Sequence, residues 1–206
     1  MSLPKPYYSH AGQTIYLGDC REILSELPKV DLVLTDPPYP NNANHFCDGI
    51  ETAKWMLTNV KSEHLLVFWD EMERPITELP LVAVHIWHRS NTNRPDNYEP
   101  IYEFRADGVK RASRVFSYPV IAKGLTGCVE ATGHPTQKNR KLIADLIAKA
   151  PNPQTILDPF MGSGTTLVAA KQLGRKGIGI EIEERYAEIA ALRLSQEVMD
   201  FSEVQA

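Results

Sequence analysis

Short, almost continuous apolar runs recur along this chain and alternate with stretches that have helical periodicity. The clearest runs are DLVLTD at 31–36, HLLVFWD at 64–70 and GIGIEI at 177–182. A strand with apolar residues on both faces needs cover on both faces, which parallel sheets receive from helices. The alternation therefore predicts an α/β protein with three layers and a mostly parallel sheet.

The same reading predicts the other elements. Further strands are expected at 14–19, 81–89, 98–104 and 154–160, and helices at 20–28, 50–60, 139–150, 165–173 and 184–198. Residues 105–133 have little periodicity, several basic residues and turn glycines, so we expect them to leave the core. The expected sheet has seven strands.

Composition limits the class of protein. A hydrophobic fraction of 43% over 206 residues fits one well-packed globular domain. No apolar run approaches the roughly 20 residues that span a membrane, and the first residues lack the apolar stretch of a secretion signal. Cys20, Cys47 and Cys128 lack metal-ligand spacing and are expected to be reduced thiols in the cytoplasm. His45 and Cys47 alone make no metal site, so no metal is expected.

Charge is unevenly distributed along the chain. Residues 85–141 hold ten Lys/Arg and five Asp/Glu, a balance of +5, whereas the rest holds twelve and twenty-one, a balance of −9. A basic middle on an acidic body is one pattern of a phosphate-binding surface. A solvated surface of mixed charge would give the same counts, and both interpretations stay open at this point.

A glycine loop follows the expected strand at 154–160. In LDPFMGSGTT, Gly162 and Gly164 stand between a strand and a helix, where glycine permits a tight turn and close approach of a ligand. Glu181, at the end of the next strand, is placed to bind ribose hydroxyls. The loop is not G-x-G-x-x-G and lacks a phosphate-loop lysine, so it favours a ligand with a ribose but no pyrophosphate. S-adenosylmethionine fits that description.

A second motif, LTDPPYPNN, ends the strand at 31–36. Two prolines after a strand remove two backbone donors and stiffen the chain between Asp36 and Tyr39. Taken alone, the motif could be a simple turn with a stacked tyrosine.

Four segments together resemble the DNA amino-methyltransferases, which methylate adenine N6 or cytosine N4. These are TDPPY at 35–39, HPTQK at 134–138, LDPFMGSGTT at 157–166 and GIEIEERY at 179–186. Their order resembles the beta-class permutation of that family. The resemblance implies S-adenosyl-L-methionine as cofactor, DNA as partner and a circularly permuted, Rossmann-like seven-stranded sheet in which 14–19 is the third strand.

The resemblance also assigns roles to residues. The catalytic residues would be Asp36, Pro37, Pro38 and Tyr39, with Tyr39 stacking on an extruded base. The cofactor would be bound by Asp19, Asp36, Thr136, Lys138, Asp158, Phe160, Gly162, Ser163, Gly164, Thr165 and Glu181.

We expect a single domain over 1–206, with a catalytic half at about 14–104 and a cofactor half at about 134–198. Between them, about 105–133 would be a short target-recognition insertion. DNA contacts are expected from Arg89, Arg105, Lys110, Arg111, Arg114 and Lys123. So short an insertion predicts short or relaxed specificity, or help from a homodimer mate or another protein.

Alternative activities were weighed against the same residues. We favour adenine N6 over cytosine N4, because Ser-Pro-Pro-Tyr is more typical of the cytosine enzymes. Methylation of a protein glutamine uses Asn-Pro-Pro-Tyr, which this sequence lacks. Methylation of cytosine C5 needs a cysteine nucleophile, which typically follows a proline, and none of the three cysteines here does so. A catalytically silent nucleic-acid-binding subunit is disfavoured because the acid and both glycines are retained. RNA stays open as a substrate.

Overall fold

A computed structural model describes residues 3–38, 49–69, 74–92, 97–121 and 137–196. These residues build one nine-stranded sheet in the order β1-β2-β9-β8-β3-β4-β6-β5-β7. Its strands are β1 (Tyr8–His10), β2 (Gln13–Leu17), β3 (Leu32–Thr35), β4 (His64–Phe68), β5 (Leu81–Arg89), β6 (Tyr98–Arg105), β7 (Val115–Tyr118), β8 (Thr155–Asp158) and β9 (Lys176–Glu181).

The inner seven strands are those expected from the sequence, and β1 and β7 add one strand at each edge. The predicted α/β class with a mostly parallel sheet is confirmed, but the predicted number of strands was too low. The run β2-β9-β8-β3-β4 is parallel, whereas β6 is antiparallel to both β4 and β5. The two edge strands are short and mostly exposed, so they carry no apolar run to reveal them.

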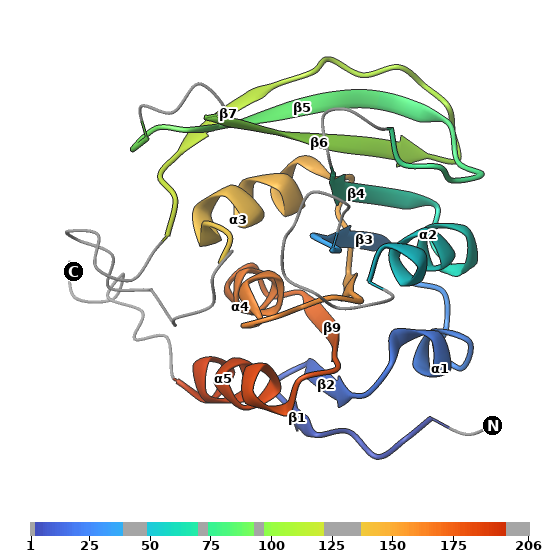
Figure 1. The fold of residues 1–206 in the computed structure, drawn as a ribbon, viewed down its shortest axis with the longest axis vertical. Helices are drawn as coiled ribbons and strands as arrows, with labels where there is room; N and C mark the ends of the chain where they lie inside the picture. The colour runs from blue at the N-terminus through green and yellow to red at the C-terminus, as the bar shows by residue number, and fades with distance from the viewer. Residues whose placement is uncertain (1–2, 39–48, 70–73, 93–96, 122–136, 197–206) are drawn as a thin grey trace.

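Five helices cover the two faces of the sheet (Figure 1). They are α1 (Cys20–Leu24), α2 (Gly49–Asn59), α3 (Arg140–Lys149), α4 (Thr165–Gln172) and α5 (Glu184–Ser195). α1 and α2 lie on one face, and α3, α4 and α5 on the other. The apolar side chains of each helix pack on the buried runs of the central strands and form the core on both faces. No helix in the described ranges is both long and apolar enough to cross a bilayer.

The strand order brings distant motifs to one edge of the sheet. β8, with the glycine loop after it, lies between β9 and β3, and β9 in turn pairs with β2. The strands carrying the cofactor loop, Glu181 and Asp19 are therefore consecutive neighbours, as the permuted order predicts. Because the strands are parallel, their carboxyl ends meet where open α/β sheets bind ligands.

Residues 109–118 do not leave the core as we expected. The backbone N–H of Arg111 donates to the carbonyl of Val82, and that of Ile86 donates to the carbonyl of Arg114. The segment then pairs with β5 as the parallel edge strand β7. The polar, exposed side chains of this segment hid its extended backbone, which needs hydrogen bonds rather than burial.

Candidate active site

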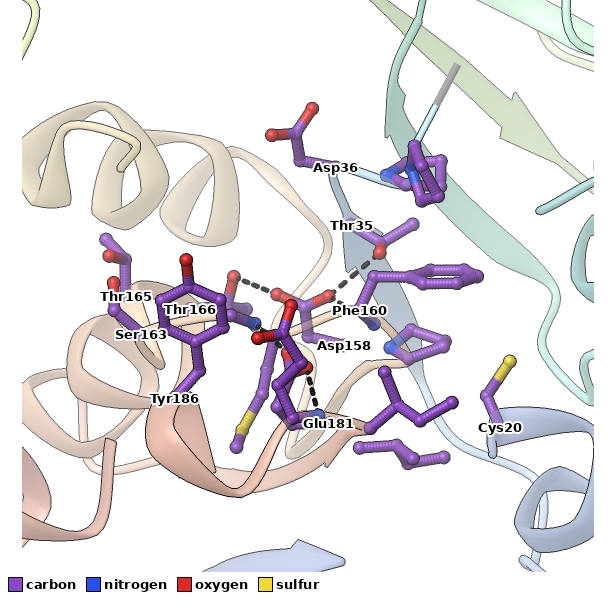
Figure 2. A pocket seen from close by; sticks show the side chains of 18 of the residues that line it. Cys20, Thr35, Asp36, Asp158, Phe160, Ser163, Thr165, Thr166, Glu181 and Tyr186 are labelled. Carbon is purple, nitrogen blue, oxygen red and sulfur yellow. Dashed lines mark hydrogen bonds between the residues drawn. The ribbon is translucent and has the colours of Figure 1, made fainter. Parts of the chain in front are cut away.

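A cavity of about 680 Å³ opens at the carboxyl edge of the central strands. Its walls come from the ends of β2, β3, β4, β8 and β9, the start of α2 and the segment before α3. Figure 2 shows Asp36, Asp158 and Glu181 following three neighbouring strands toward this cavity. Carboxyl groups from the ends of three neighbouring strands thus line one cavity.

The glycine loop and Glu181 form one side of the cavity. The backbone N–H of Gly162 donates to Glu181 Oε2 at 2.9 Å, and that of Glu183 donates to Oε1 at 2.9 Å (Figure 2). Gly162 has a φ of 51°, a left-handed conformation that favours glycine. Burial raises the pKa of the Glu181 carboxyl. The loop therefore fixes Glu181 in place at the edge of the cavity.

Gly164 has a different role from Gly162. It caps α4 with a φ of 76°, and a Cβ there would lie 2.6 Å from the Cβ of Ala190 on α5. It is not among the residues that line the cavity, whereas Ser163 and Thr165 are. The geometry explains Gly164 by the packing of α4 against α5.

Asp158 ties three elements together. The hydroxyl of Thr35 donates to Oδ1 at 2.8 Å, and the hydroxyl of Thr166 donates to Oδ2 at 2.6 Å. The backbone N–H of Phe160 donates to Oδ1 at 3.2 Å. Burial raises the pKa of Asp158 to about 6, although these three hydrogen bonds oppose the rise. Both oxygens are engaged by the protein, so Asp158 holds β3, β8 and α4 in register around the cavity.

Asp36 is the carboxylate with a free oxygen. Its Oδ2 accepts a hydrogen bond from Lys138 Nζ at 2.5 Å, whereas its buried Oδ1 has no partner within the described ranges. Burial, reinforced by nearby Glu99 and opposed by Lys138, raises the pKa of Asp36 to about 6. Pro37 and Pro38 line the cavity beside it. Tyr39 lies outside the described residues.

Asp19 and Arg21, at the start of α1, line another side of the cavity. Asp19 caps α1 by accepting from the backbone N–H of Arg21 at 2.8 Å, and the guanidinium of Arg21 binds the same carboxylate at 2.5 Å. The hydrogen bond from the Arg21 side chain lowers the pKa of Asp19. Burial raises the pKa of the neighbouring Cys20 thiol to about 12, so Cys20 offers no thiolate nucleophile.

The cavity collects most of the residues that the sequence predicted. Those that line it are Asp19, Asp36, Pro37, Pro38, Lys138, Asp158, Phe160, Gly162, Ser163, Thr165 and Glu181. Gly164 lies behind the wall, and Tyr39 and Thr136 fall outside the described residues. The prediction missed Arg21, Gln137, Arg185 and Tyr186, which also line the cavity. Tyr186 belongs to the GIEIEERY segment, so its position there could have revealed it.

The cations predicted to contact DNA are divided by the structure. Arg89 ends β5 on the side of the cavity and binds Glu99 at 2.9 Å. Arg105 ends β6, and Lys110 donates to the carbonyl of Leu81 at the start of β5, so both lie at the opposite edge of the sheet. Arg111 lies there too. Lys123 is outside the described residues.

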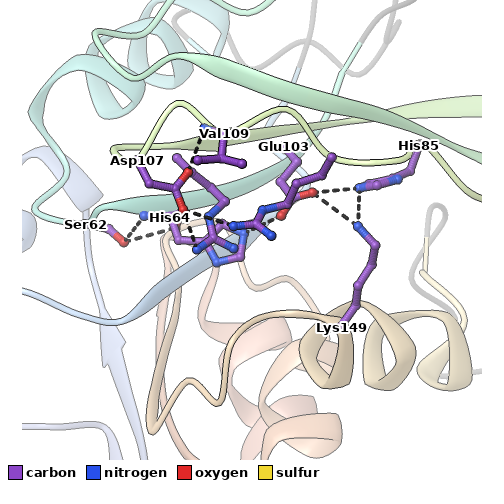
Figure 3. Close-up of polar contacts among 9 residues, drawn as sticks. Ser62, His64, His85, Glu103, Asp107, Val109 and Lys149 are labelled. Atoms are coloured by element: carbon purple, nitrogen blue, oxygen red, sulfur yellow. Dashed lines mark hydrogen bonds and ion pairs between the residues drawn. The ribbon is translucent and has the colours of Figure 1, made fainter.

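That opposite edge is held by ion pairs and a buried cluster (Figure 3). Arg105 and Arg111 each bind Asp107 at 3.0 Å. Behind them Glu103 accepts hydrogen bonds from His64 and His85, each at 3.0 Å, and from Lys149 at 3.2 Å; its side chain is 3% exposed. Burial alone would raise the pKa of Glu103, but these partners hold it below its usual range. The cluster joins β4, β5, β6 and α3.

Comparison with known proteins places these features in a family. A family model described as DNA methylase matches residues 59–192. Type II methyltransferase M.ScaI of Streptomyces caespitosus is 29% identical over 95% of this chain and 86% of its own length. Type II methyltransferase M2.LlaDCHI of Lactococcus lactis subsp. cremoris is 41% identical, over 54% of this chain and 41% of its own length.

Solved structures share the fold. The M1.HpyAVI–SAM complex superposes with a TM-score of 0.63 at 26% identity, covering 89% of this chain and all of that one. The cytosine-N4-specific PvuII DNA methyltransferase gives a TM-score of 0.67 at 17% identity, covering 98% of this chain and 91% of that one. At that identity the second likeness concerns the fold alone.

Proposed function

This chain belongs to the DNA methylase family, and from its cavity we propose that it methylates adenine N6 in DNA. The family methylates the exocyclic amino group of a base. The observation that carries the proposal for this chain is that the buried Oδ1 of Asp36 has no hydrogen-bond partner among the described residues, at the wall of a cavity that Glu181 also lines. Such an oxygen lacks a donor, and an exocyclic amine supplies one.

The cofactor is S-adenosyl-L-methionine, and the cavity fits it. A volume of about 680 Å³ is within the range of cofactor sites. Glu181 offers a fixed carboxylate for ribose hydroxyls, and the loop at Gly162 lets the backbone approach closely. No phosphate-loop lysine is present to require a pyrophosphate. When bound, the cofactor supplies a methyl group that is already strongly electrophilic.

The protein's share of the reaction is positioning and electrostatics. Oδ1 of Asp36 accepts a hydrogen bond from one N–H of the target amine, and the carbonyl of Pro37 accepts a hydrogen bond from the other. Both hydrogen bonds favour a tetrahedral nitrogen with an available lone pair. The Pro37–Pro38 pair keeps that carbonyl aligned because proline fixes the backbone. The base has to leave the helix to reach this wall, and Tyr39 is the proposed stacking partner.

We prefer adenine to cytosine as the target base because of the residue type at position 36. The motif here begins with aspartate, whereas a serine at that position is more typical of the cytosine-N4 enzymes of the family that the sequence resembles. The test is transfer of tritiated methyl to unmethylated DNA, followed by nucleoside separation. Label in N6-methyladenine supports the proposal, and label in N4-methylcytosine replaces adenine with cytosine.

A matched variant separates chemistry from binding. Asp36→Ala should abolish transfer while leaving the affinity for S-adenosyl-L-methionine nearly unchanged, because Glu181 and the glycine loop are intact. Transfer to RNA but not to DNA would contradict the proposed substrate. DNA as the proposed substrate agrees with our proposal that the protein acts in the cytoplasm, and a homodimer stays a prediction that sedimentation can test.

A further inference from the structure

Four charged side chains of alternating sign form a row that begins at Asp36 in the wall of the cavity. Lys138 Nζ lies 2.5 Å from Asp36 Oδ2 and 3.2 Å from Glu99 Oε1. The other oxygen of Glu99, Oε2, lies 2.9 Å from Arg89 Nη2. The row therefore joins the end of β3, the segment before α3, the start of β6 and the end of β5.

The middle of this row is shielded from water. The side chain of Glu99 is 5% exposed and that of Lys138 is 10% exposed. The ammonium of Lys138 lies 4.9 Å from the ring centroid of Phe68 and 5.9 Å from that of Trp87. Two carboxylates and two aromatic rings thus confine a side chain that is otherwise flexible.

Resting on the methyl transfer proposed above, we propose that Glu99 is a positioning residue for Asp36, acting through Lys138. Glu99 holds the ammonium against Oδ2 of Asp36, which leaves Oδ1 as the oxygen that faces the target amine. Arg89 holds Glu99 in turn. Glu99 lies outside all four segments that resemble the family, so no motif marks it.

The same row sets the charge on Asp36. The groups that act on this carboxyl are Lys138, Glu99 and Asp158. Lys138 favours the ionised form, and the two carboxylates disfavour it. Loss of the Glu99 charge should therefore lower the pKa of Asp36, and loss of the Lys138 charge should raise it. A group that only braced the fold would move neither.

The test compares four proteins: the wild type, Glu99→Gln, Lys138→Met and the double variant. For each, kcat and the pH profile of kcat/KM are measured with DNA. Glu99→Gln should lower kcat by roughly tenfold or more through lost positioning, and should move the acid limb to lower pH. Lys138→Met should move it to higher pH, because Asp36 and Glu99 then face each other unbridged. Adding Glu99→Gln to Lys138→Met should move it back down.

Two controls separate positioning from folding. Glu99→Asp keeps the charge and should keep the acid limb near that of the wild type. Glu103→Gln removes another buried carboxylate from β6, one that is not among the groups acting on Asp36, and should change thermal stability without moving the pH profile. A cooperative thermal unfolding transition verifies that each variant is folded.

Some outcomes would overturn the proposal. An unchanged kcat and acid limb in Glu99→Gln, or lowering of the acid limb in Glu103→Gln as well, would reduce Glu99 to a structural role. The pKa of Asp36 is also measured without turnover, by carbon-13 NMR titration of its carboxyl in each variant. The wild type could transfer no methyl to DNA while the pKa of Asp36 in that titration still falls in Glu99→Gln and rises in Lys138→Met. That outcome would count against the proposed function alone.

Discussion

The hydroxyl of Thr35 donates a 2.8 Å hydrogen bond to Asp158, a residue 123 positions later in the chain. Thr35 immediately precedes Asp36, and Asp158 begins the turn into the glycine loop. This bond therefore joins the part of the cavity wall that holds Asp36 to the part formed by the glycine loop. It lies in the core, where Thr35 is 1% and Asp158 is 4% exposed.

Thr35→Val should destabilise the protein. The change keeps the shape of the side chain but removes the shorter of the two hydrogen bonds to Asp158 Oδ1, and a hydrogen bond to a charged group contributes about 1.5–3 kcal/mol. Urea unfolding measures the loss. Thr58→Val is the control, since the hydroxyl of Thr58 bonds backbone carbonyls and the side-chain amide of Asn59 on the exposed surface of α2 and should contribute less than about 1 kcal/mol. Equal losses would contradict the role of the Thr35 bond.

Activity should depend on the ionisation of Asp36. Because its pKa is raised to about 6 by burial, the carboxyl is ionised at pH 7 and becomes protonated as the pH falls through 6. A protonated carboxyl loses acceptor capacity for the target amine, so kcat/KM should fall about tenfold for each pH unit below that value. A profile that stays flat to pH 5 would contradict the role of Asp36 as an ionised acceptor.

Much of this site was predictable because its chemistry is local in sequence. Asp36 is followed by two prolines, and Gly162 lies in a glycine loop. In both short segments the residue types predict the backbone conformation, a rigid turn at the prolines and a tight turn at the glycines. Parallel order then brings the segments together at one edge of the sheet. The alternation of buried runs and helices sufficed for the inner seven strands.

Other features could not be predicted, because they depend on partners distant in sequence. Glu99 reaches Lys138 only because β6 reverses direction beside β4. Arg111 was assigned to DNA by its charge alone, and the register of its segment along β5 places it at the far edge. None of the four residues of β7 is fully buried, so the strand is too short and its alternation too weak to be distinguished from a loop.

Glu181→Gln should weaken cofactor binding. The variant keeps the size of the side chain but removes the charge that would accept ribose hydroxyls, and hydrogen bonds to charged groups contribute about 1.5–3 kcal/mol. Calorimetry should therefore show the dissociation constant for S-adenosyl-L-methionine rising by roughly ten- to a hundredfold. Asp36→Asn serves as control and should bind the cofactor nearly as the wild type does. A similar loss in both variants would contradict a distinct ribose-binding role.

Two glycines with similar backbone angles should respond differently to alanine. Gly164→Ala meets Ala190 at 2.6 Å, whereas a Cβ on Gly174 meets nothing within 4 Å; their φ values are 76° and 67°. Gly174→Ala should cost about 1–2 kcal/mol from the left-handed conformation alone. Gly164→Ala should cost a further 1–3 kcal/mol or so, because α5 has to shift. Urea unfolding compares them, and equal costs would show that α5 yields freely.

Binding of DNA should depend on how near each cation lies to the mouth of the cavity. The backbone of Arg114 pairs beside Ile86, whereas that of Arg111 pairs beside Val82, seven residues before the cavity end of β5 at Arg89. At about 3.3 Å a residue, Arg111 lies more than 20 Å from that end. Arg111 also has an ion-pair partner in Asp107, and Arg114 is exposed.

Single charge reversals should therefore differ, although the sequence alone assigned both arginines to DNA. Arg114→Glu should weaken DNA binding and reduce the slope of log affinity against log salt by about one, because one phosphate contact is lost. Arg111→Glu should change the affinity less and leave that slope intact. Fluorescence anisotropy at several salt concentrations measures both. Equal effects would extend the DNA surface along the segment before β7 to the far end of the sheet, and no effect from either variant would remove this segment from the DNA surface.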